Sequence, residues 1–530
     1  MSDIFVITAL TGRPFSTIPE VWEARVRATP DAIFLIYQGM KWSYREASES
    51  ISLISSGLTR RGLVQSGDRV ASFLGNSPET LWTWLGALNA GTRYCPLNRA
   101  HRGPILREMI SRTRARVLVT DRSGWDELSE QAITPPMTVL LITGTELELI
   151  ATGTEAVSES VPPREKNPFS EALVIYTSGS TGRSKAVRLA HVALTHGAGR
   201  VVEAWKMSAA DVFHAWLPHF HIAGLLHQTM ATIVAGGSIA LFATFSASRF
   251  WQQIRDTQAT IVIGLPNVVN IVMNAPPHPA GDRSSLRLWL TTTINPAIQS
   301  VFEKRFGVKL LDQYGMTEAE LLTLPTLTEV VPAGSCGRPG PDWEIGVVGP
   351  DDRAVPAGAV GEIVARPKIP GILMLGYDAD DAATVDSLRN AWFHCGDSGY
   401  LDSQGFLYFS ERRKHVIRRR GENISSTELE RIISTHPEIE ACAAVGVPSP
   451  LGEDDVKLIV QLRAGSGLTT QQLYTFCQRN MAAFMLPQYI EVLTELPRTP
   501  VGKTDKDVLR RLSGKEWVAE RTAAFRSKGS

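Results

Sequence analysis

The sequence predicts an α/β protein: a large N-terminal domain with mostly parallel sheets flanked by helices, followed by a small α+β C-terminal domain. Three observations support this prediction. Helical patterns and short apolar runs alternate through most of the chain, as is typical of parallel sheets. The chain has 530 residues, too many for one ordinary core, so we expect at least two domains. The pattern then changes near Arg413 and Lys414.

In the N-terminal part, helix and strand patterns follow one another along the chain. Residues 17–32 have helical spacing, with Thr17 as a cap and a proline just after it. Further helical patterns lie at 42–63 and 77–91, and strand patterns lie at 67–76, 115–121, 258–266 and 308–315. Such alternation requires crossover connections, which place neighbouring strands parallel to one another.

The last part of the chain has a different pattern. Residues 399–413 resemble a hairpin around a Gly-containing turn, and a basic run follows. Beyond it lie helical patterns at 425–437 and 469–481 and strand patterns at 441–447 and 456–463. No Gly-, Pro- or Ser-rich linker separates the two parts, which favours a hinge over a loose tether. The sequence therefore predicts domains 1–412 and 413–530.

Composition excludes several classes of protein. Lys and Arg number 54 and Asp and Glu also number 54, so no overall field attracts nucleic acid. The five cysteines are scattered without a CxxC pair, which favours a reducing compartment over a disulfide framework or a zinc site. No signal peptide or transmembrane segment is evident. We expect a cytoplasmic protein.

Residues 175–187, IYTSGSTGRSKAV, join an apolar strand to a loop of glycines and hydroxyl residues. Successive backbone N–H groups in such a loop form an anion nest, and Lys185 adds positive charge. A flexible surface turn is the alternative interpretation. The stretch is not a Walker loop, because two residues separate Gly179 from Gly182 and Lys185 stands three beyond Gly182. It suits a phosphate chain.

The stretch YTSGSTGRSK, 176–185, resembles the phosphate loop of the adenylate-forming superfamily, which includes acyl-CoA synthetases, peptide-synthetase adenylation domains and luciferases. Four further segments resemble that superfamily, in its order and over nearly the whole chain: 217–225, 312–320, 391–430 and 496–510. The chain is identified as a member. The sequence of these segments is most similar to the crotonobetaine/carnitine-CoA ligase branch and to other acyl-CoA ligases.

The resemblance implies two half-reactions that use ATP, Mg²⁺ and CoA. A carboxylate attacks the α-phosphorus of ATP, giving an acyl-adenylate and pyrophosphate, and a thiol then displaces AMP. Negative charge builds up on phosphate oxygens, so donors and cations must converge there. The residues implied to hold the phosphates are Thr177, Ser178, Gly179, Ser180, Thr181, Gly182 and Lys185.

Further nucleotide contacts are implied by the same resemblance. Tyr314 would stack on adenine, Thr317 would donate to the α-phosphate, and Glu318 would bind Mg²⁺ through an oxygen. Asp397 would accept hydrogen bonds from both ribose hydroxyls, and Arg412 would be the second ribose contact. Taken alone, Glu318 is equally a helix-start carboxylate, Asp397 a turn residue and Arg412 a member of a solvated basic run.

The resemblance also implies that the C-terminal domain rotates between the two half-reactions. Lys503 would contact both the acid and the α-phosphate during adenylation, although a lone lysine there is ordinarily surface charge. Lys414 stands at the hinge position. Rotation between half-reactions would withdraw Lys503 and bring Gly421 to the pantetheine tunnel, with Arg418, Arg419 and Arg420 near CoA phosphates or simply solvated.

The acid pocket is implied to include His221, Thr292, Gly315 and Met316. Four histidines fall close together between 214 and 227, but no carboxylate or cysteine joins them, so a metal cluster is disfavoured. Residues 288–299, LWLTTTINPAIQ, make one wall bulkier and more hydroxylated than in many relatives. The acid, fatty or small, is therefore left open.

The sequence predicts an ATP-dependent acyl-CoA ligase acting on a small-molecule carboxylic acid. Three alternatives stay open. In the first, the enzyme passes the acyl group to an acyl carrier protein instead of CoA. In the second, the chain is a non-catalytic nucleotide- or acyl-binding homologue. In the third, it is a luciferase-like oxygenase. Competition between CoA and a carrier protein would test the first alternative. A binding protein would tolerate the loss of Glu318, Asp397 or Lys503, and a light assay would detect an oxygenase.

Overall fold

The computed structural model describes residues 2–60, 62–151, 165–177, 184–264, 266–273, 284–291, 296–412, 416–419, 422–449, 453–497, 504, 506–511 and 517–518. The chain forms two compact units. The larger comprises Met1–Arg99, Met109–Tyr176 and Ala186–Arg413. The smaller comprises Ala100–Glu108, Thr177–Lys185 and Lys414–Ser530.

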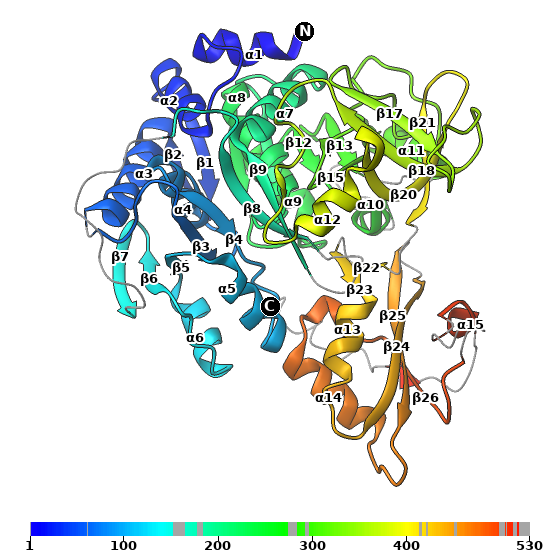
Figure 1. The fold of residues 1–530 in the computed structure, drawn as a ribbon. Coiled ribbons are helices and arrows are strands. Elements are labelled where there is room, and N and C mark those ends of the chain that lie inside the picture. The colour runs from blue at the N-terminus through cyan, green and yellow to red at the C-terminus, as the bar shows by residue number, and fades with distance from the viewer. Residues whose placement is uncertain are drawn as a thin grey trace. The chain divides into compact units, whose positions relative to one another are not determined.

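The first sheet has the strand order β19-β9-β8-β4-β3-β5-β6-β7 across the described residues (Figure 1). Its strands are β3 (Arg69–Phe73), β4 (Arg93–Pro96), β5 (Val117–Thr120), β6 (Thr138–Thr143), β7 (Glu146–Ala151), β8 (Glu171–Thr177), β9 (Lys185–Ala190) and β19 (Gly376–Tyr377). The pairs from β8 through β4, β3 and β5 to β6 are parallel. Antiparallel pairs, β6–β7 and β19–β9, lie at the two edges.

The second sheet has the order β14-β13-β12-β10-β11-β1-β2. Its strands are β1 (Ile33–Tyr37), β2 (Met40–Ser43), β10 (Val212–Ala215), β11 (Ser238–Leu241), β12 (Ile261–Ile263), β13 (Leu288–Thr291) and β14 (Lys309–Asp312). Every pair from β1 to β14 is parallel, and only the edge pair β1–β2, within this described sheet, is antiparallel.

Two smaller antiparallel elements complete the strands of the larger unit. One is the sheet β17-β18-β20-β21, built from β17 (Trp343–Val348), β18 (Gly361–Pro367), β20 (Phe393–Leu401) and β21 (Leu407–Arg412). The other is the short hairpin of β15 (Gly315–Met316) and β16 (Glu320–Leu321). The second element carries two of the predicted catalytic residues.

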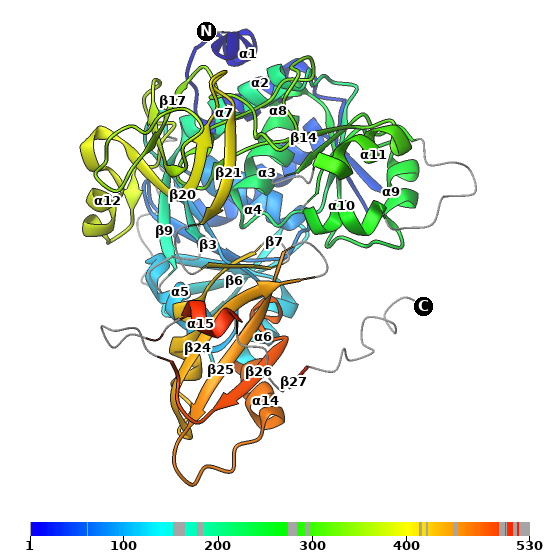
Figure 2. The same cartoon turned by 90° about the vertical axis from the view of Figure 1, so that its right-hand side faces the viewer.

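Helices flank the sheets (Figure 2). They are α1 (Ser2–Thr11), α2 (Ile18–Ala28), α3 (Tyr44–Thr59), α4 (Pro78–Asn89), α5 (Gly103–Thr113), α6 (Arg122–Glu130), α7 (His191–Ala204), η1 (Gly224–Met230), α8 (Ala231–Ala235), α9 (Phe250–Thr257), α10 (Pro266–Met273), α11 (Pro296–Phe306), α12 (Asp381–Ser387) and η2 (Arg389–Ala391). Helix α4 packs on β3 and β4, and its neighbour α3 packs on β1 and β2. This helix pair therefore lies between the two parallel sheets.

The predicted fold class is confirmed: the larger unit is α/β with mostly parallel sheets flanked by helices. Local signals explain why. Thr17 caps α2 and forms a capping box with Glu20, and Ser43 and Glu46 do the same for α3. Helix α7 is buried on nearly all sides and packs on α1, α2 and α8, so one hydrophobic core runs through the unit.

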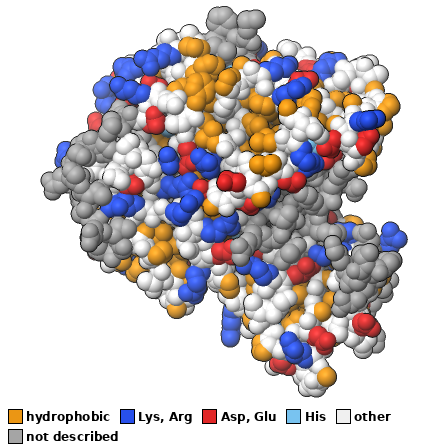
Figure 3. Space-filling model, in the orientation of Figure 1, with side chains coloured by type: hydrophobic (Ala, Val, Ile, Leu, Met, Phe, Trp, Pro, Cys, Tyr) orange, Lys and Arg blue, Asp and Glu red, His pale blue; other side chains and the backbone are white. Residues whose placement is uncertain are grey.

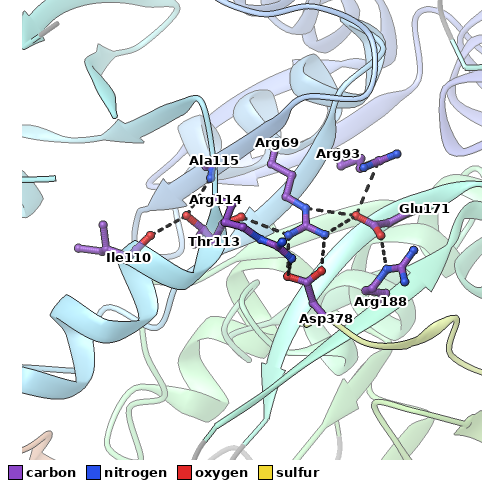
Figure 4. Close-up of polar contacts among 9 residues, drawn as sticks. All are labelled: Arg69, Arg93, Ile110, Thr113, Arg114, Ala115, Glu171, Arg188 and Asp378. Carbon is purple, nitrogen blue, oxygen red and sulfur yellow. Dashed lines mark hydrogen bonds and ion pairs between the residues drawn. The ribbon is translucent and has the colours of Figure 1, made fainter. Parts of the chain in front are cut away.

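A buried ionic network lies where β3, β4 and β8 begin. Arg69 donates to Oε1 of Glu171 at 2.9 Å and to both oxygens of Asp378 at 2.8 and 2.9 Å (Figure 4). Arg93, Arg114 and Arg188 surround the same two carboxylates. Figure 3 shows Lys and Arg side chains gathered over the region where Figure 1 places β4 and β8. Although burial opposes ionisation, hydrogen bonds from Arg69 and Arg114 lower the pKa of Asp378 to about 2.

The smaller unit is α+β in its described part. A hairpin of β22 (Val416–Arg419) and β23 (Glu422–Ser425) precedes the sheet β24-β25-β26-β27. That sheet contains β24 (Ile439–Pro448), β25 (Asp454–Leu462), β26 (Tyr489–Leu493) and β27 (Trp517–Val518), with α13 (Ser426–Ile433), α14 (Thr470–Asn480), η3 (Ala483–Met485) and α15 (Lys506–Arg511). The predicted helices at 425–437 and 469–481 correspond to α13 and α14, and both have hydroxyl N-caps.

Candidate active site

Thr317 and Glu318 lie in the turn of the β15–β16 hairpin. Gly315 pairs with Leu321 and Met316 with Glu320, so the two predicted catalytic residues stand between paired strands. The carbonyl of Glu318 accepts a hydrogen bond of 2.8 Å from the N–H of Met374. Glu318 is therefore not at the start of a helix, and that alternative interpretation of the sequence is wrong.

Gly315 is required by a close backbone approach across this hairpin. A Cβ atom at this position would lie 1.7 Å from the carbonyl oxygen of Glu320, far inside van der Waals contact. Glycine alone fits there without opening the hairpin. Gly315 and Met316, both predicted to border the acid pocket, thus also determine where Thr317 and Glu318 lie.

Glu320, at the far side of the turn, is a buried carboxyl group. Burial raises its pKa well above the ordinary value, and the charge of Arg200 opposes this only in part. Its packing is tight, because a Cβ atom on Gly197 would lie 2.5 Å from Oε2 of Glu320. This buried carboxyl group therefore packs against α7 at the base of the hairpin that carries Glu318.

The structure brings together three residues predicted to bind the nucleoside. The hydroxyl of Tyr314 donates to Oδ2 of Asp397 at 2.9 Å, and both residues are buried. Asp397 lies in β20 opposite Arg412 of β21. Burial, together with neighbouring Cys395 and Asp397, raises the pKa of Tyr314 well above its ordinary value, so the phenol stays a donor. Tyr314 also begins the segment that leads into the β15–β16 hairpin.

Tyr377 was not predicted from the sequence, although it contacts a predicted catalytic residue. Its hydroxyl donates to Oε1 of Glu318 at 3.0 Å. Burial and the nearby Glu318 carboxylate raise the pKa of Tyr377, which keeps the phenol protonated. The only signal in the sequence was a Gly-Tyr pair after the apolar run GILML, and nothing in that pair points to a partner far away in the chain.

The chemistry of Glu318 fits Mg²⁺. Magnesium in nucleotide enzymes takes one or two carboxylates and completes its coordination with phosphate oxygens and water. Within the described ranges, no group of three or more His, Cys, Asp or Glu side chains is arranged to hold a metal ion. A single carboxylate at the predicted phosphate end of the nucleotide site is the donor set that such an ion uses when ATP supplies the rest.

The clustered histidines are separate core residues. His219 bonds to Oδ1 of Asn76 at 3.0 Å and to Oγ1 of Thr229 at 2.8 Å. His214 and His227 bond to glutamine side chains. Burial lowers the pKa of each of these three histidines to about 4. His221, predicted to border the acid pocket, is half-buried beside Phe220.

The phosphate loop is described only at its two ends. Thr177 ends β8, and its hydroxyl lies 3.5 Å from the carbonyl oxygen of Lys185, with which β9 begins. The following predicted residues lie outside the described part of the chain: Ser178, Gly179, Ser180, Thr181, Gly182, Thr292, Lys414, Gly421 and Lys503. Arg412 is described by its backbone position in β21 alone.

Residues 22–377 match the model of the AMP-binding enzyme, and residues 428–503 match that of the AMP-binding enzyme C-terminal domain. The chain therefore belongs to the AMP-binding enzyme family. Together with its CoA ligase relatives, this family defines the class of protein, an AMP-forming acid–CoA ligase.

The relatives agree with this assignment. Crotonobetaine/carnitine–CoA ligase of Citrobacter koseri is 30% identical, over 93% of this chain and 98% of its own. Among solved structures, o-succinylbenzoate-CoA synthetase of Bacillus subtilis has a TM-score of 0.81 at 24% identity, over 93% and 98% of the two chains. An amide bond synthetase of Marinactinospora thermotolerans has a TM-score of 0.80 at 24% identity, over 92% and 99%. These two structures show the shared fold.

No helix in the described part of the chain is both long enough and apolar enough to cross a membrane. The AMP-binding family and its CoA ligase members imply substrates for this chain in general terms: ATP, a carboxylate and CoA.

Proposed function

We propose that this chain activates a carboxylic acid with ATP as an acyl-adenylate, releasing pyrophosphate, and then transfers the acyl group to CoA, releasing AMP. In the first step the acid oxygen bonds to the α-phosphorus as the bond to pyrophosphate breaks. In the second, the CoA sulfur bonds to the acyl carbon as the bond to AMP breaks.

The hydrogen bond between Tyr314 and Asp397 is the observation that carries this proposal. It joins the predicted adenine and ribose contacts, and the chain from Tyr314 continues directly into the hairpin of Thr317 and Glu318. Nucleoside and phosphate contacts thus come from one continuous segment. ATP bound there would present its α-phosphate to Thr317.

Glu318 would hold Mg²⁺, which supplies charge neutralisation at the phosphates when bound. Thr177, Lys185 and the loop between them would donate to the β- and γ-phosphates. Asp397 and Arg412 would fix the ribose. The phosphate contacts support adenylation because they face negative charge that increases as pyrophosphate leaves, and the ribose contacts hold the nucleotide in place.

Lys503 would contact the acid and the α-phosphate only during adenylation. A rotation at Lys414 would then replace it with Gly421, Arg418 and Arg420 for the thioester step. Arg419 is excluded from this role, because its guanidinium is buried and bonds to Asp455 and Gln488. CoA is the acceptor that the ligase relatives favour. An acyl carrier protein is the alternative acceptor.

The proposed substrate is a class of compound, the carboxylic acids. Relatives that are named crotonobetaine/carnitine–CoA ligases are 30% identical to this chain, which supports a carboxylic acid but leaves its side group open. His221, Thr292, Gly315 and Met316 would line the acid pocket. The threonines at 291–293 would add hydroxyl groups to one wall of this pocket, which favours an acid that can pack against a hydroxylated surface.

Pyrophosphate release tests the proposal. The purified chain is given ATP, Mg²⁺ and one acid at a time from a panel of short, medium and long fatty acids, aryl acids and betaines, with and without CoA. Acid-dependent release with CoA-dependent thioester is expected. Release without thioester would indicate a carrier protein as acceptor, and a chain that binds ATP but releases no pyrophosphate with any acid would contradict the proposal.

A further inference from the structure

The side chain and the backbone of Glu318 are both held by one short segment of the chain. Oε1 accepts the 3.0 Å hydrogen bond from the hydroxyl of Tyr377. The carbonyl accepts the 2.8 Å hydrogen bond from the N–H of Met374. The hairpin turn is therefore held at two points by this segment, one of them on the carboxylate itself.

Tyr377 is in turn fixed by its own strand. In β19, Tyr377 pairs with Val187 and Gly376 with Arg188 of β9. The N–H of Tyr377 donates to Oγ1 of Thr384 at 2.9 Å. The phenol is largely buried. Its hydroxyl therefore has little freedom to follow Glu318 if that carboxylate moves.

Asp378, the next residue, anchors β19 to the first sheet. Its N–H donates to the carbonyl oxygen of Ala186 at 2.8 Å. Its carboxylate accepts from Arg69 and from Arg114 in the buried network (Figure 4). The network holds the strand, and the strand presents the phenol to Glu318.

We propose that Tyr377 is a positioning residue for metal-bound ATP: by holding Oε1 of Glu318, it fixes the orientation from which the carboxylate would bind Mg²⁺. This inference rests on the proposed function, because it takes Glu318 as the Mg²⁺ ligand. Tyr377 itself touches neither ATP nor the metal in this account. Its effect is confined to the part of ATP binding that depends on the metal.

The physical reason is the cost of orienting a flexible side chain. A half-buried glutamate samples several rotamers, and binding a metal through one of them costs conformational entropy. A hydrogen bond to one carboxylate oxygen removes most of these rotamers beforehand. Partners of this kind behind a metal ligand contribute about 10–100-fold to metal affinity or activity.

Calorimetric titration with ATP tests this inference without measuring turnover. Wild type and Tyr377→Phe are titrated with ATP in excess Mg²⁺ and again in EDTA. The phenylalanine variant is expected to bind ATP about tenfold more weakly with Mg²⁺ and equally well in EDTA. Thermal unfolding establishes that both proteins are folded.

Two further variants sharpen the test. Tyr408→Phe is the matched control, because it removes the hydroxyl from another tyrosine–carboxylate pair, Tyr408 with Asp402, and should leave both titrations unchanged. Glu318→Gln should lose the metal-dependent affinity, and adding Tyr377→Phe to it should cause no further loss, since both act through one carboxylate.

The inference is overturned if Tyr377→Phe weakens ATP binding equally with Mg²⁺ and with EDTA, or if it changes neither. Losses that add in the double variant would overturn it as well. A different result would contradict the proposed function instead. In that case ATP would bind with metal-dependent affinity, but no acid would cause release of pyrophosphate.

Discussion

The hydroxyl of Tyr314 and the carboxylate of Asp397 lie 2.9 Å apart, in a hydrogen bond that spans 83 residues of sequence. Tyr314 precedes the hairpin that carries Glu318, and Asp397 lies in β20 opposite Arg412. This contact connects the antiparallel sheet to the segment that would hold the nucleoside.

Tyr314→Phe should weaken ATP binding, because Asp397 would lose a buried hydrogen-bond donor to its carboxylate. A hydrogen bond to a charged group contributes about 1.5–3 kcal/mol, so the Kd for ATP should rise roughly 10–100-fold. A double-mutant cycle with Asp397→Asn should give a coupling energy of that size. Additive effects in the cycle would show that the contact does not matter for ATP.

Gly315→Ala should abolish adenylation while the protein stays folded. The added Cβ would lie 1.7 Å from the carbonyl oxygen of Glu320, so the hairpin must open and displace Thr317 and Glu318. Pyrophosphate release and circular dichroism measure the two effects. Gly467→Ala is the matched control, since its Cβ would meet nothing within 4 Å. Full activity in Gly315→Ala would refute the role of the hairpin.

Asp378→Asn should destabilise the larger unit by about 3 kcal/mol, since Arg69 would lose a buried charged partner. The pKa of Asp378 is lowered from 3.8 to about 2. Its ionised form therefore stabilises the fold above pH 4, and this contribution is lost as the pH falls from 4 to 2. Urea unfolding between these pH values measures it.

Asp378→Asn is also the control for the pH dependence of the wild-type stability. Between pH 4 and pH 2, the difference in stability between wild type and Asp378→Asn should shrink, because the wild-type carboxyl group becomes neutral. A difference that stays constant over this range would contradict the assigned pKa.

Lys503→Ala should slow adenylation roughly 100-fold, the scale of one lost charge contact in a transition state. Thioester formation from preformed acyl-adenylate should continue. Lys506→Ala is a control from the same stretch, because Lys506 bonds to Ser426 and Glu430 and should affect stability alone. Equal loss of both half-reactions in folded Lys503→Ala would refute the assignment.

Part of the fold could be predicted from local patterns in the sequence. Thr17 with Glu20 and Ser43 with Glu46 are capping pairs that are visible in the sequence, and apolar runs indicated the strands. Contacts between distant residues could not be predicted in this way. Arg69 and Asp378 are 309 positions apart, and nothing local distinguishes a buried ion pair from two surface charges.

The candidate site shows the same division. The resemblance to a known superfamily pointed to Tyr314, Glu318 and Asp397, but it gave no geometry. Tyr377 was missed because its contact with Glu318 spans 59 residues. The helix-start interpretation of Glu318 was wrong because a two-residue strand pairing, which leaves almost no periodic signal, forms a hairpin there.

Exchange of labelled pyrophosphate into ATP measures acyl-adenylate formation by this chain without the thioester step. We expect exchange that requires one class of carboxylic acid and Mg²⁺, proceeds without CoA, and falls with Lys503→Ala. ATP cleavage to ADP and phosphate, or no exchange with any acid by a chain that binds ATP, would contradict it.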